Sequence, residues 1–95
     1  MDARHWIVKC IDKPGMLPVR QQHLEAHRAY LGSNPIKIAV SGPLVADDGE
    51  TMIGSFFIVE AETREEVEAF QAGDPLFKAG VWESREIHRF FKRVG

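Results

Sequence analysis

The sequence of 95 residues has one cysteine, no long apolar run and no marked excess of either charge. With Cys10 alone, an internal disulfide and a cysteine-based structural zinc site are excluded. No apolar run approaches the roughly 20 residues that span a bilayer, so we expect no membrane segment. The 12 Lys and Arg residues are matched by 14 Asp and Glu residues, whereas a nucleic-acid-binding domain usually has a basic excess.

Several short motifs are missing as well. No glycine-rich phosphate loop is present, and no histidine pair has the His-Glu-x-x-His setting of a zinc protease. Ser41 and Ser55 lack the context of a nucleophile elbow. The segment Met1–His5 has no apolar stretch of the kind found in signal peptides. We therefore expect a cytoplasmic protein without a cofactor or a tightly held metal.

The size of the chain indicates a single domain that spans residues 1–95. No repeat, linker or low-complexity tract divides it, and domains usually have roughly 100–150 residues. A chain this small buries only about 60–65% of its unfolded surface. Its core is therefore modest, and dimerisation would add to it.

Hydrophobic periodicity and turn residues predict six main elements. Strands are predicted at 5–11, 36–41, 53–61 and 82–91, and helices at 18–31 and from 63 to about 72, with a short helical turn at 75–80. Gly42 and Pro43 are expected to end the second strand. Thr63 and Glu66 have the spacing of a capping box at the start of the second helix. The third strand is apolar on both faces, which is typical of a central strand.

The element order β-α-β-β-α-β predicts an α+β protein of the ferredoxin-like type. In this fold a four-stranded antiparallel sheet carries both helices on one face. The other face has too many Trp, Phe and Ile residues to be left in water. We therefore expect a homodimer through that face. Either Phe57 and Val59 or their neighbours of opposite parity, Phe56 and Ile58, should lie at the contact between the sheets.

The first helix has polar residues within the arc that should be buried. Arg20, His23 and His27 lie between two apolar flanks at 100° per residue. The opposite side holds Gln21, Gln22, Glu25 and Arg28, which are typical of a solvated face. Buried polar groups need partners. The three side chains either lie at the edge of the helix interface, next to water, or line a pocket.

Two further groups are candidates for a site. Asp74 lies between Gly73 and Pro75, where it is either a turn or N-cap residue or a carboxylate that orients a histidine. Ser41, Gly42 and Ser55 can bring hydroxyl and backbone N–H groups to a ligand. His23 and His27 are four residues apart and could share a metal, but this signal is weak.

These residues resemble the YciI-like, or YCII-related, family along nearly the whole chain. The resemblance rests on Arg20-x-x-His23-Leu24, Ser41-Gly42-Pro43-Leu44, Gly54-Ser55, the run Gly73-Asp74-Pro75-Leu76-Phe77-Lys78-Ala79-Gly80-Val81, and residues 87–92 with their Phe90-Phe91-Lys92 end. It implies the ferredoxin-like fold and a dimeric α+β barrel. One branch of the family resembles dehydrochlorinases that act on chlorinated hydroxyquinols.

The resemblance also implies a His–Asp pair in a pocket, with the histidine at His23 and the aspartate at Asp74. Arg20 and the Ser41-Gly42-Pro43 turn belong to the same region by motif, and Arg20 could bind an anionic group. His27 is an additional polar residue without a family role, and together with Ser55 it is a candidate for ligand contact.

Three classes of function remain open. The first is an enzyme that uses His23 and Asp74 for cofactor-free proton transfer, as a lyase, isomerase or dehydrochlorinase, on a small phenolic or anionic substrate. The second is a non-catalytic ligand-binding or accessory domain, and the third is a dimerisation module. The enzyme requires His23 and Asp74 within hydrogen-bond reach in an open cleft, the binding domain requires only the cleft, and the module predicts a filled cleft.

Overall fold

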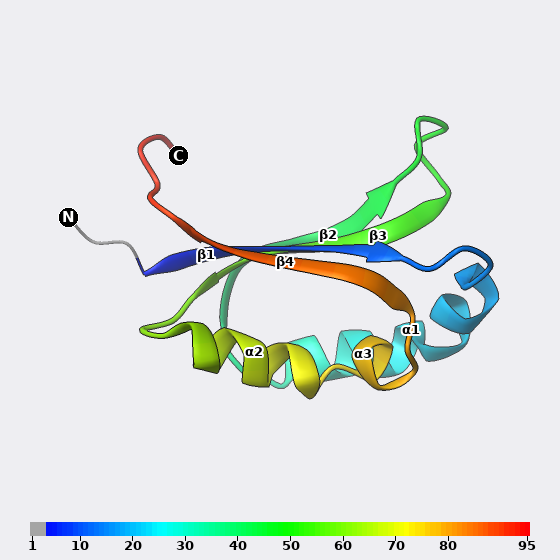
Figure 1. Cartoon of the computed structure of the whole chain (residues 1–95), viewed down its shortest axis with the longest axis horizontal. Helices are drawn as coiled ribbons and strands as arrows, with labels where there is room; N and C mark the ends of the chain where they lie inside the picture. Colours follow the sequence, from blue (N-terminus) through cyan, green and yellow to red (C-terminus); the bar gives the residue numbers. More distant parts are fainter. Residues whose placement is uncertain (1–3) are drawn as a thin grey trace.

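The computed structural model describes residues 4–95. The expectation about a signal peptide rests partly on residues 1–3, which lie outside the described residues. The chain forms β1 (His5–Asp12), α1 (Leu17–Gly32), β2 (Lys37–Val45), β3 (Met52–Glu60), α2 (Arg64–Ala72), α3 (Pro75–Lys78) and β4 (Trp82–Phe90). The helices lie on one face of the sheet, and the β2–β3 hairpin and the C-terminal end rise from the other face (Figure 1).

The four strands form one antiparallel sheet in the order β2-β3-β1-β4. This arrangement confirms the ferredoxin-like prediction, including the central place of β3. Thr63 accepts the backbone N–H of Glu66, and Glu66 in turn accepts the N–H of Glu62 at the start of α2. Thr63 therefore caps α2 as predicted, and the reciprocal bond of Glu66 is made one residue before the cap, to Glu62.

The prediction that Gly42 and Pro43 end the second strand is wrong. β2 continues through both residues to Val45, and Pro43 pairs with Ser55 of β3. β2 is an edge strand with a partner on one side only. A proline without an N–H is tolerated there because the missing donor would face away from the ladder.

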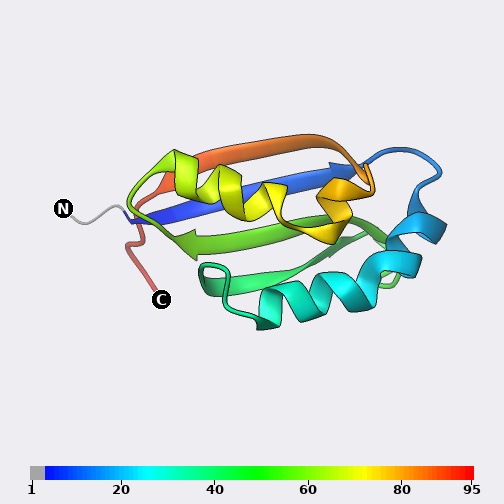
Figure 2. The same ribbon diagram turned by 90° about the horizontal axis from the view of Figure 1, so that it is seen from below.

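The hydrophobic core lies between the sheet and the helices. Phe57 and Val59 of β3 face this core, together with Val67 and Phe70 of α2, and all four are buried. The other buried apolar residues are Trp6, Val8, Cys10, Ala61, Leu76, Val81 and Trp82. In Figure 2, α2 crosses the β1 and β4 side of the sheet, whereas α1 runs beside β2. The two helices thus cover different halves of one face.

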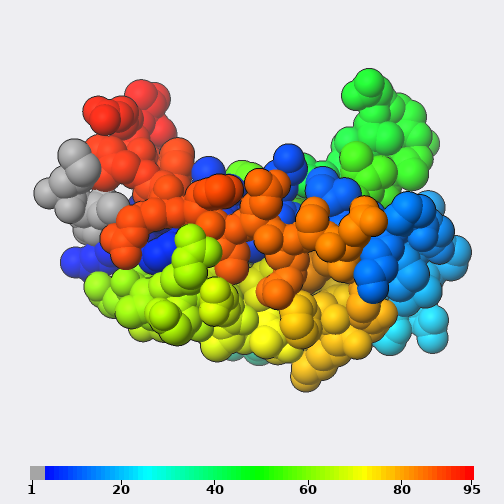
Figure 3. All heavy atoms as spheres, in the orientation of Figure 1, coloured from blue at the N-terminus to red at the C-terminus, as the bar shows by residue number. Residues whose placement is uncertain are grey.

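The opposite face of the sheet has no helix and is called the open face here. Successive side chains of a strand point to opposite faces of the sheet, so Phe56 and Ile58 lie on the face opposite to Phe57. Ile7 and Val40 pair with Ile58 and therefore lie on the open face as well. Val40 is 53% exposed. The space-filling view shows this side as a hollow between the C-terminal end and the β2–β3 hairpin (Figure 3).

Candidate active site

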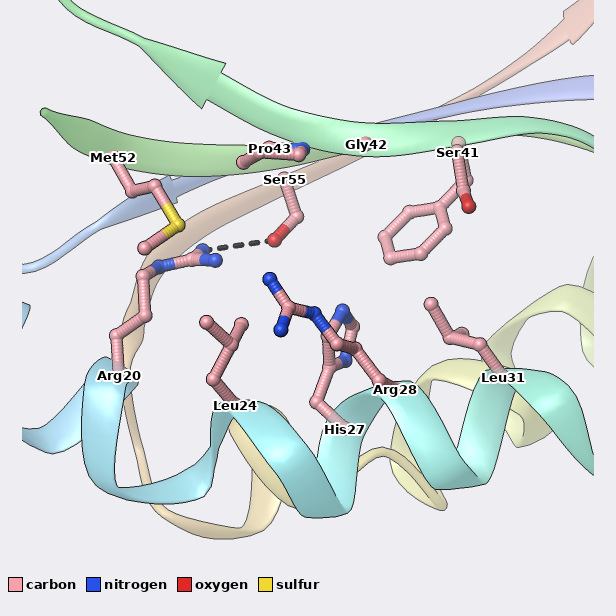
Figure 4. Close-up of a pocket in the computed structure, with 11 residues that line it drawn as sticks. Arg20, Leu24, His27, Arg28, Leu31, Ser41, Gly42, Pro43, Met52 and Ser55 are labelled. Atoms are coloured by element: carbon pink, nitrogen blue, oxygen red, sulfur yellow. Dashed lines mark hydrogen bonds between the residues drawn. The ribbon is translucent and has the colours of Figure 1, made fainter. Parts of the chain in front are cut away.

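A cavity of about 230 Å³ lies between α1 and strands β2 and β3. Arg20, Leu24, His27, Arg28 and Leu31 of α1 form one wall, and Ser41, Gly42, Pro43, Met52, Ser55 and Phe57 form the other (Figure 4). An apolar cavity of about 150 Å³ accommodates a benzene ring, so this one has room for a substituted single ring. Among the described residues that line it, none is acidic.

His27 lines this cavity, and its imidazole is held by Asp74. Nδ1 of His27 lies 2.8 Å from both carboxylate oxygens of Asp74. His27 is 7% exposed and Asp74 is fully buried. The imidazole also packs edge-on against Phe57, with the ring centroids 6.3 Å apart. An ionised carboxylate only accepts hydrogen bonds, so a neutral His27 carries its hydrogen on Nδ1 and presents the lone pair of Nε2 to the cavity.

Asp74 is fixed by the backbone on which it lies. It is the N-cap residue of α3, where Oδ1 also accepts the backbone N–H of Leu76 at 2.8 Å. Pro75 restricts Asp74 to an extended backbone. Gly73 allows the end of α2 to approach α1, because a Cβ at this position would lie 2.5 Å from the hydroxyl oxygen of Tyr30. The two interpretations of Asp74, as N-cap and as partner of a histidine, are thus both correct.

The predicted pair of His23 with Asp74 is wrong as a contact, because His27 occupies that place. No hydrogen bond or ion pair joins His23 to Asp74 in the described part of the chain, and His23 is not among the residues that line the cavity. The difference comes from the direction in which α1 faces the sheet. Arg20 and His27, seven residues apart, are the buried residues of α1. They lie about 20° from each other on the helix, so the inward face is centred on them.

Arg20 is buried next to the cavity, and its contacts differ from those expected of an anion-binding residue. Its Nε and Nη2 donate to the two carboxylate oxygens of Asp12 at 2.7 and 2.8 Å. Nη2 also donates to the hydroxyl oxygen of Ser55 at 2.8 Å (Figure 4). Arg20 is 1% exposed. Its charge is thus matched by Asp12, and each of these three hydrogen bonds is made to the protein itself.

Arg28 is exposed, as predicted for the solvated face of the helix, but it also lines the cavity. Its backbone is on the exposed side of α1, but its side chain extends along the cavity and contributes to the lining (Figure 4). No ion pair or hydrogen bond engages the Arg28 guanidinium within residues 4–95. A long side chain can reach round the helix edge, which a helical wheel does not represent.

The cavity brings together most of the remaining predicted residues. Ser41 and Gly42 line it from β2, and Ser55 lines it from β3. Ser55 is 2% exposed, whereas Ser41 and Gly42 are exposed. In the described chain, no three His, Cys, Asp or Glu side chains come together to hold a metal ion. None of the helices formed by residues 4–95 is both long enough and apolar enough to cross a membrane.

The family model of the YCII-related domain matches residues 5–91 of the sequence. The chain belongs to the YCII-related family. No curated protein sequence matches it.

Among solved structures, one similar to this YCII-related chain is the 5-chloro-2-hydroxyhydroquinone dehydrochlorinase TftG from Burkholderia phenoliruptrix AC1100, in complex with 2,5-dihydroxybenzoquinone. The two are 37% identical with a TM-score of 0.84, and the match covers 92% of this chain and 93% of TftG. An uncharacterised NIPSNAP domain protein from Burkholderia xenovorans has a TM-score of 0.53 at 14% identity, over 94% of this chain and 93% of that one. The second likeness shows the fold alone.

Sequence reasoning missed two residues of this YCII-related site. Asp12 is the partner of Arg20, although it is not among the candidate residues of the sequence analysis. An arginine in a helix arc that should be buried requires a carboxylate or several acceptors nearby. That requirement could have directed attention to Asp12, which is the nearest acidic residue before the helix. Nothing in the pattern of α1 indicated the direction of the Arg28 side chain.

Proposed function

We propose that this protein is a small-molecule enzyme in which His27, oriented by Asp74, transfers protons on a phenolic or anionic substrate without a cofactor. The observation that carries the proposal is the hydrogen bond of His27 Nδ1 to the buried carboxylate of Asp74, next to an open cavity. This bond leaves Nε2 of His27 for the ligand. An imidazole has an ordinary pKa near neutrality, which suits it to take up and return protons.

The composition of the cavity supports an electron-rich, planar ligand. Leu24, Leu31 and Phe57 provide apolar surface, while Arg28 and Ser55 provide hydrogen-bond donors. A single aromatic ring with hydroxyl groups fits the size of the cavity and has both an apolar face and acceptor oxygens. The absence of a carboxylate in the described lining favours a ligand that bears negative charge.

The likeness to TftG supports one reaction class within this proposal, which is the loss of a hydrogen halide from a halogenated hydroxyquinol. In such a reaction Nε2 of His27 takes a proton from one phenolic hydroxyl, and the proton returns to the ring carbon that bears the halogen. A second hydroxyl then loses its proton to His27. The carbon–halogen bond breaks as the second C=O bond forms. The products are a hydroxybenzoquinone, a halide ion and a proton, so atoms and electrons balance without an external oxidant.

We also propose a homodimer in which the open faces of two copies meet. Ile7, Phe56, Ile58 and Val40 form an apolar surface there that no helix covers. Such a surface on a chain of 95 residues adds to a core that is small for a domain. The cavity lies on the helix side of the sheet, so this contact leaves the cavity open to a ligand.

The test of the enzyme is halide release from 5-chloro-2-hydroxyhydroquinone and from related halogenated hydroxyquinols, followed with a chloride electrode under anaerobic conditions. The wild-type protein should release chloride in proportion to the quinone formed. His27→Ala should reduce the rate to background, whereas His23→Ala, one helical turn away on α1, should retain it. The two substitutions are matched in chemistry and differ in their contact with Asp74.

Two results would contradict the proposal. Equal activity of wild-type protein and His27→Ala would show that the imidazole takes no part in the reaction. Binding of hydroxyquinols without any conversion, across the tested leaving groups, would favour the non-catalytic ligand-binding domain. A cavity open to ligand is less compatible with the dimerisation module, which predicts a filled cleft.

A further inference from the structure

The hydroxyl group of Ser55 cannot donate to its neighbour Arg20, because it already accepts a hydrogen bond from that side chain. Its oxygen accepts a hydrogen bond from Nη2 of Arg20 at 2.8 Å. A guanidinium group has no acceptor, so the direction of this bond cannot be reversed. The hydroxyl hydrogen of Ser55 must therefore point to another acceptor. No hydrogen bond donated by Ser55 is made within residues 4–95, and Ser55 lines the cavity.

Asp12 holds the donor of that bond in place. Arg20 uses both Nε and Nη2 on the carboxylate of Asp12, in the two-pronged geometry that fixes a guanidinium plane. Arg20 and Asp12 have side chains that are 1% and 7% exposed. The arginine charge is compensated within the protein, and the hydroxyl of Ser55 extends the network along the cavity, which Arg20 also lines.

We propose, on the basis of the function proposed above, that Ser55 donates a hydrogen bond to a negatively charged oxygen of the ligand, and that Arg20 and Asp12 are the positioning residues for this donor. The ligand then has two oxygens with different partners. One is a phenolate or enolate oxygen that accepts from Ser55, and the other carries the proton that His27 takes. A buried donor whose oxygen is held in place before the ligand arrives stabilises developing oxyanion charge with little reorganisation.

The experiment uses 4-nitrophenol as the probe, because its phenolate absorbs visible light and the ionised fraction of the bound probe can be read directly. The protein is titrated with the probe at several pH values, and the affinities for the phenol and the phenolate are determined separately. Wild-type protein should bind the phenolate in preference to the phenol. Ser55→Ala should weaken phenolate binding about tenfold to a hundredfold, as expected for the loss of a hydrogen bond to a charged group, and change phenol binding much less.

Ser41→Ala is the matched comparison, because Ser41 also lines the cavity but makes no hydrogen bond to Arg20. The change in phenolate affinity should be several times smaller in Ser41→Ala than in Ser55→Ala. Thermal unfolding of both variants identifies any loss of folded protein. An equal effect of the two substitutions would overturn the proposal, and so would the failure of wild-type protein to prefer the phenolate.

The positioning role is tested with the neutral pair Asp12→Asn with Arg20→Gln, which avoids a buried charge without a partner. This double substitution should weaken phenolate binding in the wild-type background and add little in the Ser55→Ala background, because it acts through Ser55. Equal losses in both backgrounds would show that Arg20 and Asp12 do not act through Ser55. These binding measurements do not require turnover. If halide release fails while the Ser55 dependence holds, only the proposed function is wrong.

Discussion

Asp74 binds His27 and caps α3 with the same carboxylate. Oδ1 lies 2.8 Å from Nδ1 of His27 and also 2.8 Å from the backbone nitrogen of Leu76. Because the cap fixes the carboxylate to the backbone, the imidazole is held by the fold and not by a flexible side chain. The orientation of His27 is therefore determined before any ligand enters the cavity.

Asp74→Asn should preserve the fold and reduce the proposed activity by a factor on the order of 10²–10⁴, the usual contribution of acid–base catalysis. The amide retains an oxygen that can cap Leu76, but its NH₂ group can donate to Nδ1 of His27 and so favour the other tautomer. Halide-release kinetics measure the loss, and ¹⁵N NMR of the imidazole identifies the tautomer. Unchanged kinetics together with a changed tautomer would mean that the orientation of His27 is irrelevant to the rate.

Arg28→Ala should raise the KM of an anionic substrate several-fold and leave kcat nearly unchanged. The guanidinium lies at the exposed wall of the cavity without an ion pair to the described residues. It can thus attract substrate and transition state alike, which affects binding more than the chemical step. Arg28→Lys keeps the positive charge, so its KM should stay close to that of the wild-type protein. The difference in KM between Arg28→Lys and Arg28→Ala should shrink at high salt. A loss in kcat with constant KM would place Arg28 in the chemical step instead.

Asp12→Ala should lower the free energy of unfolding by about 3–5 kcal/mol, because it leaves Arg20 buried without its partner. Chemical denaturation in urea measures this value. Lys37→Ala is the control, since Lys37 makes an ion pair with Glu60 across 3.3 Å but its side chain is 76% exposed. Exposed pairs contribute roughly 0–1 kcal/mol. A similar loss in the free energy of unfolding for the two substitutions would mean that the contact of Arg20 with Asp12 is as weak as a surface ion pair.

Alkaline pH should destabilise the protein through Cys10. Burial raises the pKa of the Cys10 thiol from 9.0 to about 12. Between these two values the unfolded chain releases the thiol proton and the folded chain retains it. Unfolding therefore becomes easier as the pH rises, by at most about 1.4 kcal/mol per pH unit for one group.

The measurement for Cys10 is the free energy of unfolding between pH 8 and pH 10.5, in wild-type protein and in Cys10→Ala. Stability should fall more steeply with pH in the wild-type protein. Burial, and then the charge of Asp74, also raise the pKa of Tyr30. Tyr30 is present in both proteins, so the difference in slope isolates the thiol. Parallel slopes would show that Cys10 ionises as readily in the folded chain as in the unfolded one.

The proposed homodimer should dissociate when a charge enters the open face. Wild-type protein should sediment as a dimer at micromolar concentration, and Val40→Lys should shift it to a monomer. Phe77→Lys is the control, because Phe77 is 37% exposed and lies on the helix side of the molecule, in the short helix α3. A wild-type monomer at this concentration, or dissociation by both substitutions, would contradict a contact through the open face.

The fold was predictable because local signals and the global pattern agree. The apolar and β-branched residues of β1, the capping box of Thr63 and Glu66, and the Gly73-Asp74-Pro75 break each specify one element. The extent of β2 was not predictable, because the tolerance of Pro43 depends on the edge position of the strand. That position is a property of the sheet and not of the strand sequence.

The site was predictable in its residues but only partly in its contacts. Asp74 was identified, but its partner was placed one helical turn too early at His23. A wheel that uses hydrophobicity to find the inward face fails for α1, because the residues that are buried there are Arg20 and His27. The contacts of Arg20 depend on a carboxylate eight positions away in the sequence, across a turn.

The polar contacts that hold α1 to the rest of the protein favour ligand binding at the expense of the stability of the fold. These contacts run from Arg20 to Asp12 and from His27 to Asp74. Both Arg20 and His27 line the cavity. Apolar residues in place of both pairs would let the helix settle onto the strands, since buried ion pairs are often no more stabilising than well-packed apolar groups. A more stable variant of this protein is therefore one in which the cavity is filled, and selection for stability alone would remove the site.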